Sequence, residues 1–178
     1  MIDRCLDEEQ DAQFEIYKLY YKAMYNTSLR IVADRTDAED IMQESFLTAF
    51  RKLKHYKGDV SFGAWLKKIV INRSLDYLRK RKVQFEELNA NLPVTDEMPD
   101  SNENFTVDEI KTAIFELPDG YRTVLSLILL EGYDHEEVAE ILGVRNVSSR
   151  TQFFRARQKL KELLISKRIE KLKMENYG

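Results

Sequence analysis

Apolar side chains recur every three or four residues along most of the chain, which is the spacing of amphipathic helices. The first such stretch predicts a long helix whose shared face we expect to be core: Phe14, Tyr17, Tyr21, Met24, Tyr25 and Leu29. A second helix is expected from Thr36 to about Leu53, because Thr36-Asp37-Ala38-Glu39 has the form of a capping box. Its apolar stripe consists of Met42, Phe46, Ala49, Phe50 and Leu53.

A third helix follows the break at Gly58-Asp59 and ends in the basic turn 79–82. We expect Trp65 to belong to the core rather than to form a stacking platform, because an aromatic residue at helical spacing usually packs inside. The apolar positions of this helix are Phe62, Trp65, Leu66, Ile69 and Leu78. The three helices together predict a first domain over residues 8–82.

Residues 83–106 contain Pro93, Pro99 and many acids without apolar periodicity, which predicts a flexible acidic linker. A second domain is expected over residues 107–166, and the apolar run 121–130 predicts a helix buried on most of its sides. A short helix precedes that run and ends before Pro118-Asp119-Gly120; its apolar positions are Val107, Ile110, Ile114 and Leu117.

Two short helices joined by a tight turn are indicated near the C-terminus. Asp134 is a candidate N-cap with Glu137 three residues later, and Gly143 is suited to the positive φ of a C-cap. Asn146 is expected to cap the next helix. This pattern predicts a helix-turn-helix.

Composition agrees with an all-α fold of two small helical domains joined by an acidic flexible linker, the second containing the helix-turn-helix. Only three prolines and six glycines are present. Cys5 is the single cysteine, and His55 and His135 are the only histidines, so we expect no metal site and no cofactor. No run is apolar enough to span a membrane, and a cytoplasmic protein is expected.

The net charge of −3 conceals two basic segments. Residues 51–82 carry eleven Lys and Arg against two acids, and residues 141–161 carry six against none. Residues 83–110 between them hold eight acids and no Lys or Arg. One such run is usually a solvated face, but two basic segments around an acidic one favour nucleic-acid binding.

The second helix of the helix-turn-helix has the composition of a DNA-recognition helix, in which Arg reads guanine and Gln reads adenine in the major groove. The candidates for contacts with base edges are Ser148, Ser149, Arg150 and Gln152. Those for contacts with phosphates are Arg145, Arg155 and Arg157. A plain helical hairpin with a solvated basic face is the alternative interpretation of this segment.

Three blocks of the sequence resemble bacterial RNA polymerase sigma factors of the sigma-70 family, extracytoplasmic-function (ECF) group. Residues 117–157, through Tyr133-Asp134-His135-Glu136-Glu137-Val138-Ala139-Glu140-Ile141-Leu142-Gly143, resemble region 4, which in the family reads the promoter −35 element. Asp37-Ala38-Glu39-Asp40-Ile41-Met42-Gln43-Glu44-Ser45-Phe46 resembles region 2.2, which grips the β′ clamp helices of the polymerase. Phe62-Gly63-Ala64-Trp65-Leu66 and residues 71–80 resemble regions 2.3 and 2.4, implicated in −10 melting and recognition.

The resemblance implies a set of partners and a site for each. Core RNA polymerase, through its β′ clamp helices and β subunit, would contact Asp37, Glu39, Asp40, Gln43, Glu44 and Leu47. Melted −10 DNA would contact His55, Tyr56, Lys57, Asn72, Arg73, Asp76, Arg79 and Lys80. Double-stranded −35 DNA would contact the second helix of the helix-turn-helix, and an anti-sigma factor is expected as a further partner. The linker would pass through the polymerase.

Other interpretations remain open from the residues alone. The acids after Thr36 also suit the N-terminal half of a helix, where the dipole favours them. A free-standing helix-turn-helix regulator is the alternative function, although it leaves the block 37–46 unexplained. A protein-interaction bundle leaves the two basic segments unexplained. An enzyme is not expected, because the sequence has no Gly-rich phosphate loop and no nucleophile motif.

Overall fold

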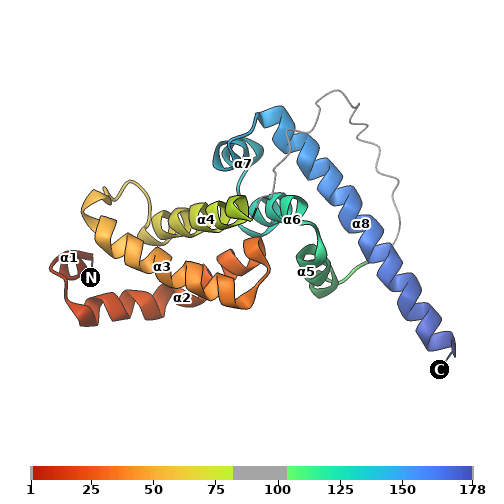
Figure 1. Ribbon diagram of the computed structural model, residues 1–178, viewed down its shortest axis with the longest axis horizontal. Coiled ribbons are helices and arrows are strands. Elements are labelled where there is room, and N and C mark those ends of the chain that lie inside the picture. The colour runs from red at the N-terminus through yellow and green to blue at the C-terminus, as the bar shows by residue number, and fades with distance from the viewer. Residues whose placement is uncertain (1, 82–103, 178) are drawn as a thin grey trace. The chain divides into compact units, whose positions relative to one another are not determined.

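The computed structural model describes residues 2–81 and 104–177, and every regular element within these ranges is a helix (Figure 1). The chain divides into two compact units, Met1–Val83 and Gln84–Gly178. The predicted all-α fold is confirmed. Most of the predicted acidic linker, residues 83–103, lies outside the described residues. No helix in the described ranges is long and apolar enough to cross a membrane.

The first unit is built on three long helices that pack against one another in every pairing. Its elements are α1 (Ile2–Leu6), α2 (Gln10–Val32), α3 (Arg35–Lys52), η1 (Leu53–His55, a 3-10 turn) and α4 (Phe62–Lys80). Their shared core contains Cys5, Ala12, Ile16, Met24, Met42, Phe46, Ala49, Leu53, Phe62, Leu66 and Val70. The apolar stripe predicted for 42–53 is therefore part of this core.

The face that α2 turns inward agrees only in part with the predicted one. Met24 is buried and Tyr17 and Tyr25 pack against the core as predicted, but Phe14 is 59% exposed and Tyr21 43% exposed, and the buried Ile16 was not predicted. Lys18 lies over the Phe14 ring at 4.7 Å, and Tyr21 stacks on Tyr17 with ring centroids 5.6 Å apart. The prediction took large aromatic residues for the core, but small and aliphatic residues allow α2 to approach α3 and α4 closely.

α3 begins at Arg35, two residues after the left-handed residue Ala33 ends α2 (φ 56°). Its N-cap is Asp34, whose Oδ1 accepts from the backbone N–H of Asp37 at 2.9 Å. The predicted capping box on Thr36 is therefore wrong, because Thr36 already lies inside the helix. The carboxylate of Asp34 satisfies the free N–H group of the first turn.

α4 begins after Ser61, whose hydroxyl accepts from the backbone N–H of Ala64. A Cβ at Gly63 would lie 2.8 Å from Tyr20 Cε1, so glycine allows α2 and α4 to come this close. Trp65 is half-buried and packs against the core, with its ring centroid 5.3 Å from that of Tyr56 and 5.7 Å from that of Phe62.

The second unit contains α5 (Val107–Glu116), α6 (Asp119–Leu125), η2 (Ser126–Leu130), α7 (His135–Leu142) and α8 (Asn146–Tyr177), the long blue helix of Figure 1. One core of this unit joins Ala113, Ile114, Leu117, Leu125, Ala156, Leu160 and Leu164. Val107 is 65% exposed, so it does not belong to the apolar face predicted for α5. The helix predicted over 121–130 ends in a π-helical turn, in which the N–H of Glu131 donates to the carbonyl of Ser126.

α7 and α8 are the two helices of the predicted helix-turn-helix. Asp134 and Glu137 form a reciprocal capping box, and Gly143 ends α7 in the left-handed region at φ 70°, as predicted. The N–H of Ser149 donates to the carbonyl of Arg145, so Asn146 already lies within the first turn of α8. Its Oδ1 accepts from Arg150 Nε at 3.3 Å. The predicted N-cap at Asn146 is therefore wrong.

Candidate nucleic-acid interface

A groove of about 580 Å³ runs between α3 and α4 in the first unit. Its lining residues are Asp37, Asp40, Ile41, Glu44, Thr48 and Lys52 of α3 and Ile69, Asn72, Arg73, Asp76, Tyr77 and Lys80 of α4. Three predicted polymerase contacts therefore share one groove with four predicted −10 DNA contacts. The sequence analysis had treated these two sets as separate surfaces.

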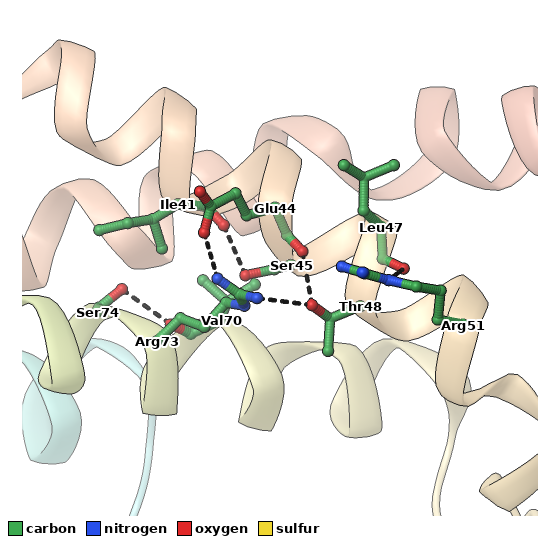
Figure 2. A network of polar contacts seen from close by, with 9 residues as sticks. All are labelled: Ile41, Glu44, Ser45, Leu47, Thr48, Arg51, Val70, Arg73 and Ser74. Atoms are coloured by element: carbon green, nitrogen blue, oxygen red, sulfur yellow. Dashed lines mark hydrogen bonds and ion pairs between the residues drawn. The ribbon is translucent and has the colours of Figure 1, made fainter.

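The guanidinium of Arg73 crosses the groove from α4 to α3 (Figure 2). Its Nη1 forms an ion pair with Glu44 Oε2, and its Nη2 donates to Thr48 Oγ1 at 2.8 Å. The hydroxyl of Thr48 in turn donates to the backbone carbonyl of Glu44 at 2.9 Å, which leaves its lone pair for Arg73. A predicted DNA contact and a predicted polymerase contact are thus joined directly.

Asp37 is tied to the C-terminal end of α4. Its carboxylate accepts from the Tyr77 hydroxyl, and Arg81 Nη1 lies 4.0 Å from the same oxygen. The Arg81 guanidinium also lies over the Tyr77 ring at 5.7 Å. The hydrogen bond to Asp37, followed by burial, raises the pKa of Tyr77. These contacts assign Asp37 a structural task at the α3–α4 junction.

The four other predicted polymerase contacts, apart from Asp37 and Glu44, differ in whether they have a hydrogen-bond partner. Glu39, Asp40, Gln43 and Leu47 are exposed, and Leu47 is 59% exposed despite its apolar side chain. Glu39 accepts a long hydrogen bond from Gln43 at 3.4 Å, whereas Asp40 has no hydrogen bond or ion pair with any residue in 2–81 or 104–177. Charged and apolar groups available side by side suit a protein partner.

The segment between α3 and α4 carries three of the predicted −10 DNA contacts: His55, Tyr56 and Lys57. Tyr56 is half-buried, its hydroxyl donates to the Val60 carbonyl at 2.6 Å, and its ring meets Phe62 edge-on at 5.8 Å. Tyr56 therefore anchors the turn, while the side chains of His55 and Lys57 on either side are exposed to solvent.

The remaining predicted −10 contacts lie on the exposed side of α4. Asn72, Asp76, Arg79 and Lys80 are exposed, and Arg79 Nη1 forms an ion pair with Asp76 Oδ1 at 3.0 Å. Asn72 and Lys80 line the groove, but Arg79 does not. Arg79 and Asp76 largely neutralise one another locally, which leaves Lys80 as the cation of this face that lines the groove.

The arginines predicted to bind DNA, Arg145 directly before α8 and three on α8, are accessible to different degrees. Arg145, Arg150 and Arg157 are exposed, whereas Arg155 is half-buried. Arg157 lies over the Phe153 ring at 5.8 Å. Arg150 and Arg157, seven residues apart, share one side of the helix.

Three of the residues predicted to contact base edges do not share that side. Ser148 and Ser149 are fully buried, and Gln152 is 4% exposed. Ser148 and Gln152 lie on the i, i+4 row that continues through the buried Ala156 and Leu160. These three side chains are therefore inaccessible in the free chain, and their contacts with base edges stay a prediction.

His135 lies on the first turn of α7 and meets the Phe153 ring edge-on, with centroids 5.2 Å apart. Its Nδ1 is buried without a hydrogen-bond partner. Burial and then the nearby Arg150 cation lower the pKa of His135, and Asp134 acts in the opposite direction. This imidazole therefore favours its neutral form where the two helices meet.

Two structurally important residues escaped the sequence analysis: Thr48, which holds Arg73, and Tyr77, which holds Asp37. Each lies four residues from a predicted site residue, so helical spacing could have placed Thr48 beside Glu44 and Tyr77 beside Arg73. The cross-helix pairing required the tertiary structure. Over the described residues, no group of three or more His, Cys, Asp or Glu is placed to hold a metal ion.

Comparison with known proteins assigns these units to a family. Residues 16–83 match Sigma-70 region 2, and residues 108–160 match Sigma-70, region 4. The chain is 30% identical over 153 residues to the ECF RNA polymerase sigma factor SigM of Bacillus subtilis, covering 84% of this chain and 93% of the relative. It is 29% identical over 156 residues to the ECF sigma factor SigE of Mycolicibacterium smegmatis, covering 84% of this chain but only 60% of that longer relative.

Solved structures of similar fold include the sigma factor RpoE of Bartonella quintana, determined in complex with the anti-sigma factor NepR. That structure aligns with a TM-score of 0.58 at 24% identity and covers 88% of this chain and 98% of the other. CnrH, determined in complex with the cytosolic domain of CnrY, aligns with a TM-score of 0.56 at 21% identity, covering 93% of this chain and 95% of the other. The matches to both sigma regions and to SigM show that the chain belongs to the sigma-70 family of RNA polymerase sigma factors, in the ECF group.

Proposed function

We propose that the two units divide the work of transcription initiation, with the first binding core RNA polymerase and the −10 element and the second binding the −35 element. The family is one of initiation factors and not of enzymes. The observation that carries the double role of the first unit is the α3–α4 groove, where an exposed acidic helix face lies beside an exposed basic one. Such a surface can contact a protein and a nucleic acid at once.

On the polymerase side, the proposal rests on the exposed part of α3. Asp40 has no partner in the described ranges, and Gln43 and Leu47 continue the same surface. Acidic groups accelerate encounter with a basic partner surface, and apolar burial contributes to the stability of the complex. We assign the β′ clamp helices to this face. Asp37 contributes indirectly by holding α3 against α4.

On the −10 side, the supporting residues are those that combine exposure with positive charge or hydrogen-bonding capacity. Asn72 and Lys80 line the groove, and His55 and Lys57 extend from the turn that Tyr56 anchors. Cations hold the phosphates of a melted strand, while imidazole and amide groups can stack on or hydrogen-bond to unpaired bases. This arrangement suits single-stranded DNA.

On the −35 side, Arg145 directly before α8 and Arg150 and Arg157 on α8 lie at the surface, and Arg155 on α8 is half-buried. Guanidinium groups pair with guanine edges and with phosphates in the major groove. Ser148, Ser149 and Gln152 are left out of this set because they are buried.

The proposal also includes an anti-sigma factor as a partner and the cytoplasm as the place of action. RpoE and CnrH, whose folds this chain shares, were determined with NepR and with the cytosolic domain of CnrY. We infer that this chain is held inactive by a protein of the same kind. Because core polymerase acts in the cytoplasm, the chain would act there as well.

Transcription reconstituted with the full chain and core polymerase on a promoter library tests the proposed function. Transcripts should require both components and should share upstream sequences with two conserved elements. A free-standing helix-turn-helix regulator would instead bind duplex DNA in the absence of core polymerase and would start no transcription with it. Core polymerase alone is the control.

A further inference from the structure

The carboxylate of Glu44 offsets the positive charge of the Arg73 guanidinium, so Arg73 attracts a DNA phosphate less strongly while the ion pair holds. We infer that the Glu44–Arg73 ion pair is a link between polymerase binding and DNA binding, in which a partner that engages Glu44 releases Arg73. Both residues line the α3–α4 groove, Glu44 from the helix assigned to polymerase and Arg73 from the helix assigned to DNA. The inference rests on the proposed function of these two helices.

The exposure of the two side chains makes this exchange possible. The Glu44 side chain is 62% exposed, so a cationic partner can reach its carboxylate while Arg73 is still bound. The Arg73 side chain is 33% exposed. An exposed ion pair is screened by water and contributes little to stability, so replacing one of its members by a partner's charge costs little.

Thr48 determines where Arg73 stays once the pair opens. Its hydroxyl accepts from Nη2, whereas Glu44 engages Nη1, so the guanidinium keeps one anchor when Glu44 is taken by another cation. Figure 2 shows both contacts reaching Arg73 from α3. Thr48 is thus a positioning residue that would hold the released Nη1 in the groove beside Asn72 and Lys80.

The charges around the groove favour the same outcome. Lys52 and Lys80 add positive charge to the groove. Besides Glu44, the acids that line it are Asp37, Asp40 and Asp76, and Asp37 is already engaged by Tyr77 and Arg81. Asp76 is paired with Arg79. Neutralising Glu44 therefore leaves a groove in which an anion meets Arg73, Lys52 and Lys80 with fewer opposing charges.

Linkage makes the effect reciprocal: if polymerase binding at Glu44 favours DNA binding at Arg73, removing either charge must strengthen binding at the other. We would measure two affinities with the full chain. The first is for a fluorescent single-stranded 20-nucleotide oligo-dT without polymerase, and the second is for core polymerase without DNA. The variants are Glu44→Gln, Arg73→Gln and the double variant, with Glu15→Gln, an exposed acid of the same unit on α2, as the control for loss of one negative charge.

We expect Glu44→Gln to tighten oligo-dT binding by about fivefold or more, and the gain to disappear when Arg73→Gln is added. Arg73→Gln should tighten binding to core polymerase in the wild-type background but not in the Glu44→Gln background. Glu15→Gln should leave oligo-dT binding within about twofold of wild type, because it removes the same charge without freeing Arg73. Thermal unfolding verifies that every variant is folded.

The inference is overturned if Glu44→Gln produces no gain, if the gain persists without Arg73, or if Glu15→Gln produces the same gain. A failure of the proposed function gives a different result, in which the wild-type chain starts no transcription with core polymerase. Transcription by the wild type together with zero coupling between residues 44 and 73 would reject the link alone.

Discussion

The hydroxyl of Tyr77 on α4 donates a hydrogen bond to the carboxylate of Asp37 in the first turn of α3. This contact joins residues 40 positions apart and closes one end of the α3–α4 groove. It separates Asp37, which supports the architecture, from Asp40, which is available to a partner.

Tyr77→Phe should destabilise the first unit by about 1 kcal/mol, because it removes a hydrogen bond to a charged acceptor at a half-exposed site. Urea unfolding measures the free energy of unfolding. Tyr17→Phe is the matched control, since the Tyr17 hydroxyl has no hydrogen bond within the described ranges. Equal stability of Tyr77→Phe and wild type would remove the structural role of the Asp37 contact.

Asp40→Lys should weaken binding to core polymerase by at least about tenfold, because a reversed charge in the centre of the α3 face repels a basic partner. Asp11→Lys makes the same charge change at an exposed position on α2 and should have little effect. Affinity is measured by fluorescence anisotropy with labelled chain. Undiminished binding by Asp40→Lys would exclude this face as the polymerase site.

Arg150→Ala should reduce holoenzyme affinity for promoter DNA by about tenfold while leaving association with core polymerase unchanged. Arg150 is exposed on α8, in a different unit from the α3 face. Lys173→Ala removes an exposed cation from the same helix outside the residues matched to region 4, and serves as the control. Equal loss of both affinities in Arg150→Ala would contradict the division of roles between the units.

Acid should destabilise the second unit through His135. Burial and Arg150 lower the pKa of His135 below its ordinary value of 6.5, so the unfolded chain binds a proton more readily than the folded one. The stability from a neutral His135 is present above pH 6.5 and is lost as the pH falls from there through the folded pKa. His135→Phe should show a smaller fall in Tm than wild type between about pH 7.5 and about pH 5.5. Parallel falls in Tm would exclude His135 as the titrating group.

Local features of the second unit were predictable because their determinants lie within a few residues. Asp134 and Glu137 form the predicted capping box, and Gly143 adopts the predicted left-handed conformation. The caps predicted at Thr36 and Asn146 were wrong for a local reason as well: Asp34 caps α3 two positions before Thr36, and α8 already begins at Asn146, one position after Arg145. Capping chemistry identifies a helix start but leaves its position uncertain by a turn.

The sequence by itself determined the all-α class, the succession of helices and the two sigma regions, because helical periodicity and motif spacing are properties of neighbouring residues. The tertiary structure decided which side of each helix faces inward. It exposed Phe14 and Tyr21 and buried Ser148 and Ser149 against expectation from their polarity. It also brought Glu44 to Arg73 and Asp37 to Tyr77, pairs separated by 29 and 40 residues. Such contacts depend on how helices rotate and approach one another during packing, which the spacing along a single helix does not specify.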